Sequence, residues 1–210
     1  MRYFERVLEK MSFKFIPLFS TKDNSILGYK VMKDFSTLGF DDKEYMYQMA
    51  FEEKLFDNFA LKVFEKACNE IIERKIENTF IFYTLRFNFL NDPSNFFYQL
   101  DRLIAKLNLK SDFFIFDIKG IEDWREFYKE HSKSFKYKLI LKEEKNSPFN
   151  LAILEDSKAT YMEPRTIDTL AFIKGNMNFS QPLIFNLAYV EGLDLDFLKN
   201  LDVDYYYDSK

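Results

Sequence analysis

The stretch PLFSTKDNSILGYKVMKDF, residues 17–35, predicts two β-strands joined by a short turn. Apolar and aromatic residues form the strands, and the polar run Lys22, Asp23 and Asn24 lies between them as turn residues. Because the connection, residues 20–25, is short, the two strands are expected to pair as an antiparallel hairpin. The second strand then places a cation, Lys30, where a buried or pocket-lining side chain is expected.

Six further β-rich runs follow the hairpin, and helical patterns separate most of them. The eight strands are expected at 13–19, 26–33, 79–85, 113–118, 137–141, 160–163, 182–188 and 203–207. Runs such as TFIFYTL (79–85) are apolar almost throughout, which is typical of strands covered on both faces. This order predicts a mostly parallel α/β sheet in a single domain, 1–210, and both a closed barrel and a doubly wound open sheet fit it.

Helical periodicity fills the intervals between these strands. Helices are expected at 1–12, at 44–74 as two helices broken near 56–58, after Asp92, near Glu122, at 149–156, after Pro164 and at 194–200. Cys68 falls within the apolar pattern of the second of these regions. A lone cysteine there is expected to be a small buried hydrophobe, and a reducing, cytoplasmic location fits it.

The composition argues against several classes of function. The formal net charge is −4 and no basic patch stands out, which argues against a general affinity for nucleic acid or anionic membranes. The first residues, MRYFERVLEKM, mix charged and apolar side chains, unlike a signal peptide, and no run approaches the roughly 18 apolar residues of a membrane span.

Familiar catalytic constellations are absent from the sequence. The only histidine, His131, is expected at the surface near a helix C-terminus, so a histidine-based nucleophile system has no base. The five glycines are scattered singly without a phosphate-binding pattern, and one His and one Cys make no zinc site. The 34 carboxylates leave a site for Mg²⁺ or Ca²⁺ as the open question.

Two long ungapped stretches resemble the EAL-domain family, the cyclic-di-GMP phosphodiesterases named after a Glu-Ala-Leu motif. The segment IPLFSTKDNSILGYKVM (16–32) keeps Pro17, Gly28 and Tyr29 of the family pattern, but Glu-Ala-Leu itself reads Lys30-Val31-Met32. The segment KEEKNSPFNLAILEDSKATYME (142–163) matches the family's Asp-Asp-Phe-Gly region, its leucines and the strand before its lysine. The resemblance covers 17–207 and implies a modified TIM-like (β/α)8 barrel with an antiparallel first strand and no counterpart of the family's final helix.

The resemblance also assigns the family's site positions to residues of this chain. The metal-binding Glu is matched by Lys30, and the Glu ligand of the fourth strand by Asp117. The remaining assignments are an Asn ligand at or near Tyr83, the Asp pair at Lys142 and Glu143, the lysine that helps to activate water at Glu163, and a late Glu at or next to Glu191.

These exchanges imply a degenerate EAL-like domain whose catalytic motif is lost. Lys30 and Lys142 replace anionic ligands, which changes the site charge by about four units and repels a divalent cation. No metal, cofactor or catalytic residue is therefore expected. The two lysines are expected either to pair with Asp117, Glu143 and Glu163 or to point into solvent.

The expected function is that of a catalytically inactive bacterial regulatory protein in cyclic-di-GMP signalling, acting through contact with an unknown protein partner. The alternative is a metal-free sensor that binds cyclic-di-GMP or another anion through Lys30 and Lys142, although Glu163 would repel a phosphate. A third hypothesis is another reaction with Asp117, Glu143 and Glu163 as acid or base groups. Resemblance to the family makes a homodimer plausible, and neither nucleic-acid binding nor membrane insertion is expected.

Overall fold

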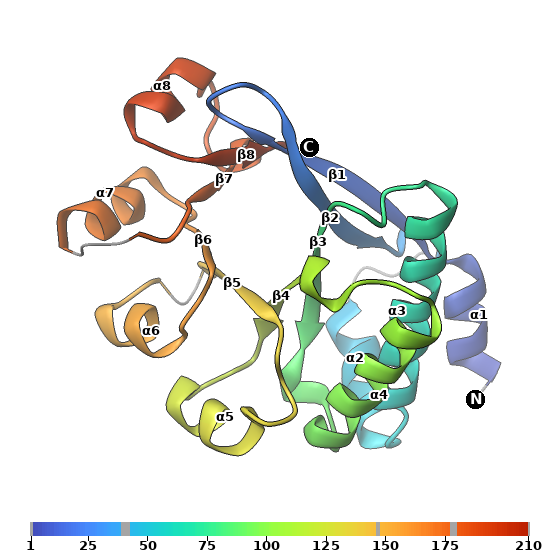
Figure 1. The fold of residues 1–210 in the computed structure, drawn as a ribbon. Coiled ribbons are helices and arrows are strands. Elements are labelled where there is room, and N and C mark those ends of the chain that lie inside the picture. The colour runs from blue at the N-terminus through green and yellow to red at the C-terminus, as the bar shows by residue number, and fades with distance from the viewer. Residues whose placement is uncertain (1, 39–42, 146–147, 177–179, 210) are drawn as a thin grey trace.

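The computed structural model describes residues 2–38, 43–145, 148–176 and 180–209. Within these ranges the chain forms a ring of eight strands surrounded by helices (Figure 1). The strands are hydrogen-bonded in the order β6-β5-β4-β3-β2-β1-β8-β7, and a bridge between Met162 and Leu183 joins β6 to β7. The sheet is therefore a nearly closed barrel, one of the two architectures that the periodicity left open.

The elements alternate as expected for a barrel of this kind. The strands are β1 (Ser12–Ser20), β2 (Ile26–Asp34), β3 (Phe80–Arg86), β4 (Phe114–Lys119), β5 (Lys138–Lys142), β6 (Tyr161–Glu163), β7 (Ile184–Asn186) and β8 (Tyr205–Tyr207). The helices are α1 (Arg2–Lys10), α2 (Lys43–Glu52), α3 (Phe56–Glu73), α4 (Pro93–Lys106), α5 (Trp124–His131), α6 (Leu151–Asp156), α7 (Ile167–Asn176) and α8 (Leu195–Asn200).

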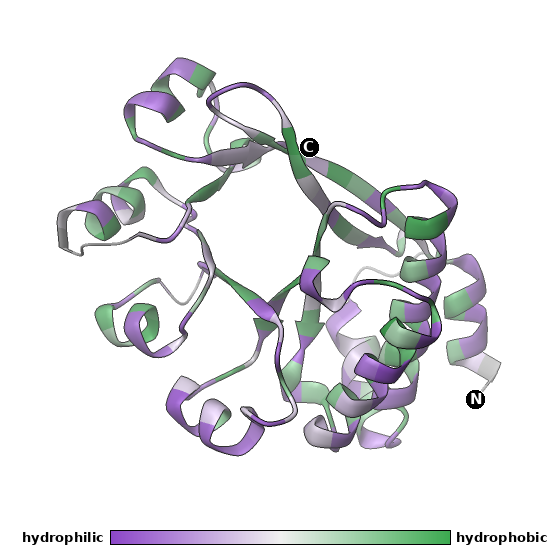
Figure 2. Cartoon of the chain, in the orientation of Figure 1, coloured by the Kyte–Doolittle hydropathy of each residue, from purple (hydrophilic) through white to green (hydrophobic). Residues whose placement is uncertain are grey.

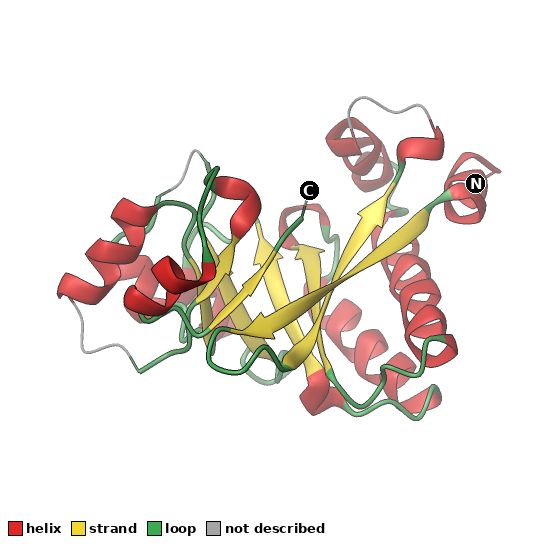
Figure 3. Cartoon of the chain, turned by 90° about the horizontal axis from the view of Figure 1, so that it is seen from above, coloured by secondary structure: helices red, strands yellow, loops and turns green. Residues whose placement is uncertain are grey.

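The predicted antiparallel hairpin is confirmed. β1 and β2 pair from Ser12 opposite Asp34 to Phe19 opposite Ile26, while β2 runs parallel to β3. The turn is held by the Asp23 carboxylate, which accepts a hydrogen bond from the Ser25 backbone N–H at 3.1 Å. In Figure 3 the β1–β2 ribbon lies in front of the other strands and extends toward α1. The hairpin thus reverses the chain, so that β2 runs in the same direction as β3.

The contact between β2 and β3 depends on a glycine. A Cβ atom built on Gly28 would lie 2.1 Å from the Phe80 carbonyl oxygen, a distance that real side chains do not adopt. Only glycine lets the two backbones approach this closely. The close approach fixes the register that places Lys30 opposite Phe82.

Two apolar layers hold the barrel together. Inside it, a small cluster fills the axis: Leu18, Phe82, Ile115, Ile140, Tyr161, Ile184 and Tyr207. Outside it, a larger and mainly aromatic cluster packs between the strands and the helices. Figure 2 shows hydrophobic residues along the strands and hydrophilic residues on the outward turns of the helices. The abundant phenylalanines therefore serve mainly as core.

Some local expectations were wrong. The break between α2 and α3 falls before Phe56, where Lys54 adopts a left-handed backbone with φ 58°, and not at 56–58. His131 is buried rather than exposed, because it packs against the rings of Phe87, Phe97 and Phe127. The expected burial of Cys68 is confirmed. No helix in the described ranges is both long enough and apolar enough to span a membrane.

Candidate functional site

The candidate site is a cavity of about 230 Å³ at the end of the barrel where the parallel strands finish. Strands β2 to β5 and the segments around β7 and β8 contribute its walls, because their last residues point to the same end. Its lining includes Lys30, Lys33, Lys43, Tyr47, Thr84, Arg86, Asp117, Lys119, Lys142, Asn186, Tyr189, Tyr207 and Ser209. Six of these side chains are basic and one is acidic.

A buried carboxylate, Glu163, organises the floor of this cavity. The Lys30 Nζ lies 2.7 Å from Glu163 Oε2, and the Lys142 Nζ lies 3.3 Å from Glu163 Oε1. The hydroxyls of Tyr207 and Tyr189 donate to Glu163 Oε1 at 2.6 Å and 3.2 Å. Glu163 itself is fully buried, and Lys30 is 8% exposed. The floor is thus one acid shared by two lysines and two phenols.

The electrostatics of the floor follow from burial and from this pairing. Burial opposes the charge of Glu163, but Lys30 and Lys142 outweigh it and lower the pKa of Glu163 to about 2. Burial alone would lower the pKa of Lys142, whereas Glu163 and Asp117 raise it above its ordinary value. For Lys30, burial prevails and holds its pKa below the ordinary value. Glu163 is therefore the fixed negative charge of the floor.

Asp117 stands beside this group without an ion pair of its own in the described ranges. Its carboxylate accepts a hydrogen bond from Thr84 Oγ1 at 3.1 Å. Burial raises the pKa of Asp117, although Lys30, Lys119 and Lys142 act in the opposite direction. With Lys30 and Lys142 positive and Asp117 and Glu163 negative, the floor is close to neutral.

Three of the residues to which site positions were assigned lie outside the floor, namely Tyr83, Glu143 and Glu191. Tyr83 points away from the barrel axis and packs against Phe64 and Phe116, so Thr84 takes the place expected for Tyr83. Successive side chains of a strand alternate between its two faces, so an error of one residue moves a side chain out of the site. Phe82 lies inside the barrel, and Thr84, two residues later, shares its face. An interior assignment for Phe82 would therefore have predicted Thr84 as the site residue.

The Glu143 side chain points away from the two lysines and binds the segment that leads into α7. Its carboxylate accepts hydrogen bonds from the Arg165 backbone N–H at 2.6 Å and from Thr169 Oγ1 at 2.7 Å. It therefore holds the chain at the start of α7 and does not pair with either lysine. Glu191 is exposed and does not line the cavity.

Several residues that line the cavity were not predicted from the sequence. Arg86 and Lys119 each follow a floor residue by two positions, Thr84 and Asp117, and this same-face spacing is a signal that could have found them. Lys43 begins α2, and Tyr189 and Tyr207 are hidden among many other tyrosines. These side chains decide the charge and the shape of the cavity.

The residues present do not fit a divalent metal. In the part of the chain that the structure describes, no three His, Cys, Asp or Glu side chains converge on a point where they could hold an ion. Mg²⁺ and Ca²⁺ require several oxygen ligands, whereas the floor offers two ammonium groups around one carboxylate. The lysine charges occupy the position in which a cation would neutralise Glu163.

Comparison with solved structures gives the fold a name. The structure matches an EAL domain protein from Listeria monocytogenes with a TM-score of 0.72, over 97% of this chain and 88% of that one, at 13% identity. This chain has the fold of an EAL domain. The EAL domain of Xanthomonas citri FimX, in complex with c-diGMP, matches with a TM-score of 0.65 at 11% identity, over 99% of this chain and 92% of that one.

The EAL fold also occurs within a longer match. Bacillus subtilis YkuI, in complex with c-di-GMP and calcium, matches 98% of this chain and 55% of its own length, with a TM-score of 0.69 and 15% identity. No protein-family model and no curated protein sequence matches the chain significantly. The likeness is therefore one of fold, and the chemistry has to be argued from this chain's own side chains.

Lys142 and Glu163 form an ion pair across two neighbouring strands. The resemblance places an acid at position 142 and a lysine at position 163, whereas this chain has Lys142 and Glu163. The two residues are in register across β5 and β6. Lys30 adds a second cation to this pair.

Proposed function

We propose that this chain is a catalytically inactive EAL-fold domain with a regulatory role. The observation that carries the proposal is the position of the Lys30 Nζ, 2.7 Å from Glu163 and buried with it. Metal-dependent hydrolysis of a phosphodiester requires carboxylate and amide oxygens around a hard cation, which activates the water and bridges the phosphate. Two lysines bound to the fully buried Glu163 oppose such a cation electrostatically.

The test of inactivity is direct. Purified protein incubated with cyclic-di-GMP and Mg²⁺ or Mn²⁺ is expected to release no linear product, and calorimetric titration with either metal is expected to give no binding heat. An authentic EAL phosphodiesterase in the same assay serves as the positive control. Hydrolysis that follows the concentration of this protein would overturn the proposal.

An inactive domain acts through what it binds, and two kinds of ligand remain. Contact with a protein partner is one route, and its partner is not indicated by any particular surface. The second candidate function is metal-free binding of an anion, either a cyclic dinucleotide or another phosphorylated molecule. The basic lining of the cavity favours this second candidate, because Lys33, Lys43, Arg86 and Lys119 lie above a floor that is already neutral.

Anion binding is tested without metal. Calorimetry in the presence of a chelator, with cyclic-di-GMP and separately with methyl phosphate, is expected to detect binding of at least one of the two. Neutral guanosine is the matched control for the base and the sugar. Absence of heat with both anions would remove the second candidate and leave the inactive domain standing.

A further inference from the structure

The basic side chains of the cavity are distributed unevenly. Lys33 is the next-to-last residue of β2, Arg86 and Lys119 are the last residues of β3 and β4, and Lys43 begins α2 beside them. The opposite wall consists of neutral hydrogen-bonding groups, Asn186, Tyr189, Tyr207 and Ser209. We call the group of Lys33, Lys43, Arg86 and Lys119 the basic rim. A ligand in this cavity therefore meets the basic rim on one side and neutral groups on the other, above the floor where Lys30 and Lys142 are paired with Glu163.

Part of the charge of the basic rim is uncompensated. Arg86 forms an ion pair with Glu44, and Lys119 forms one with Glu144. Both acids are close to half exposed, 46% and 47%, whereas Arg86 and Lys119 are each 21% exposed. In the described ranges neither Lys33 nor Lys43 forms an ion pair. With Lys33 protonated, the four positive and two negative charges leave two positive charges available, and with Lys33 neutral they leave one.

Lys33 is the member of the rim that is most affected by its surroundings. Its Nζ donates to the Thr84 carbonyl oxygen at 2.7 Å and lies 4.4 Å from the centre of the Tyr83 ring. Burial lowers the pKa of Lys33 to about 7, and the charges of Arg86 and Lys43 act in the same direction.

The groups that face Lys33 come from several elements. Lys43 and Tyr47 belong to α2, Tyr83, Thr84 and Arg86 to β3, Asp117 and Lys119 to β4, and the apolar Phe56, Phe59, Ala60 and Val63 to α3. Of these, only Asp117 is acidic, and its attraction is smaller than the repulsion from Arg86 and Lys43. Burial and the neighbouring positive charges of the rim thus disfavour the protonated form of Lys33.

From this arrangement we infer that the basic rim is a subsite for a phosphate monoester dianion, and that Lys33 takes up a proton when the dianion binds. The inference rests on the second candidate function and specifies which end of the cavity and which charge state it uses. A dianion matches the two uncompensated charges, whereas a phosphodiester supplies only one negative charge. A bound dianion also reverses the local repulsion that keeps Lys33 from being protonated.

Methyl phosphate and dimethyl phosphate distinguish the two charge states. At about pH 8 methyl phosphate is a dianion, since its second pKa is about 6, while Lys33 is mostly neutral. Titration calorimetry in buffers of different ionisation enthalpy is expected to show uptake of close to one proton per methyl phosphate bound. Dimethyl phosphate is expected to bind more weakly and without proton uptake.

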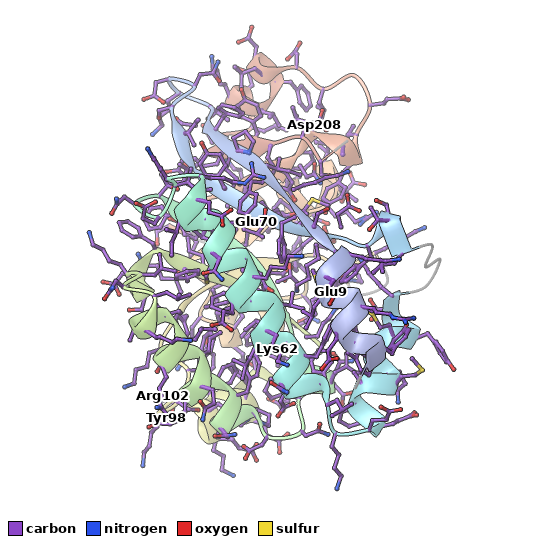
Figure 4. The ribbon with its side chains drawn as sticks, turned by 90° about the vertical axis from the view of Figure 1, so that its right-hand side faces the viewer. Glu9, Lys62, Glu70, Tyr98, Arg102 and Asp208 are labelled. Atoms are coloured by element: carbon purple, nitrogen blue, oxygen red, sulfur yellow. The ribbon has the colours of Figure 1, made fainter. Side chains whose placement is uncertain are left out.

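Variants assign the effect to the rim. Lys33→Met and Arg86→Gln are each expected to weaken methyl phosphate binding by about 10- to 100-fold, the effect of one lost charge-assisted hydrogen bond. Lys33→Arg keeps the charge at all these pH values, so it is expected to bind methyl phosphate without proton uptake. Lys62→Met removes the same charge from the outward face of α3 and is the matched control (Figure 4).

The outcomes separate this inference from the proposals on which it depends. Binding that is weakened by Lys142→Met but not by the rim variants would overturn it, because the ligand would then sit on the floor. Binding to wild type with no proton uptake would also overturn it, as would the absence of methyl phosphate binding. If cyclic-di-GMP alone binds, the second candidate stands and the dianion subsite fails. Thermal unfolding of each variant establishes that it is folded.

Discussion

At the scale of single residues, Glu163 is the group on which the floor depends. Glu163→Gln removes the negative charge and leaves Lys30 and Lys142 buried beside a neutral amide. We expect the free energy of unfolding to fall by about 3–5 kcal/mol, the usual cost of breaking a buried ion pair on one side. Urea unfolding measures the change.

The matched control for this change is Glu9→Gln on the exposed face of α1 (Figure 4). We expect it to alter the free energy of unfolding by less than about 0.5 kcal/mol. If Glu163→Gln were as mild as the control, the two lysines would have to reach solvent freely in the folded protein.

The same residue predicts a dependence on pH. The pKa of Glu163 is about 2 in the folded protein against an ordinary value of 4.5, so its contribution to stability is complete above pH 4.5. The contribution is lost as the pH falls through about 2, because the folded state then has to take up a proton that the unfolded chain already holds.

The measurement is the difference in unfolding free energy between wild type and Glu163→Gln along an acid series. This difference is expected to shrink as the pH falls from about 4.5 to about 2. A difference that stayed constant over this range would contradict the charged state assigned to Glu163.

At the scale of elements, the approach of β2 to β3 gives a paired prediction. Gly28→Ala forces a Cβ against the Phe80 backbone and is expected to cost about 1–3 kcal/mol of stability or more. Gly175→Ala, in α7, meets no atom within 4 Å and is expected to stabilise by about 0.5–1 kcal/mol, since alanine favours helix.

Chemical unfolding of the two glycine variants tests the pair. The opposite signs separate the steric effect at Gly28 from any general effect of adding a methyl group. Stabilisation by Gly28→Ala would mean that the two backbones are farther apart than the strand register requires.

The elements also explain which parts of this structure could be predicted from its sequence. The hairpin is local: Asn24 adopts a left-handed backbone with φ 60° and Asp23 accepts a backbone hydrogen bond two residues on, and both residue types favour such turns. The pairing of Lys30 with Glu163 joins residues 133 positions apart, so it follows only from the closure of the barrel. The resemblance to the EAL-domain family was what assigned Lys30 and Glu163 to the same site in the sequence analysis.

The rest of the site depends on strand parity and on composition. Tyr83 and Thr84 are neighbours in sequence but face opposite sides of β3, and an apolar run covered on both faces carries no alternation to tell them apart. Tyr189 and Tyr207 could not be predicted for another reason: they are two of the 13 tyrosines of the chain, and nothing in the sequence sets them apart.

At the scale of the whole molecule, the barrel begins with long strands and ends with short ones. β1 and β2 are nine-residue strands, whereas β6, β7 and β8 have three residues each. The junction of β6 with β7 consists of one bridge and the hydrogen bond from the Met162 N–H to the Pro182 carbonyl. The ring is therefore expected to open first at this junction.

Native-state hydrogen exchange measures this order. Amides of β3 and β4 are expected to exchange slowest, and the amide of Met162 markedly faster, because local opening there disrupts few contacts. Matched exchange protection at Met162 and in the centre of β4 would contradict the expectation and indicate a uniformly cooperative barrel.

The group of Lys30, Lys142 and Glu163 at the floor has a consequence for how this protein can change. Converting it to an oxygen-lined cation site requires Lys30 and Lys142 to be replaced, because Glu163 already offers carboxylate oxygens. Replacing one lysine leaves Glu163 paired with the other. Replacing both without adding a cation strands a buried carboxylate at a cost of several kcal/mol, a large share of the 5–15 kcal/mol by which domains are stable. The floor is therefore expected to tolerate the loss of one lysine better than the loss of both, and the second loss is expected to be tolerated only where a cation takes over the charge of the missing lysine.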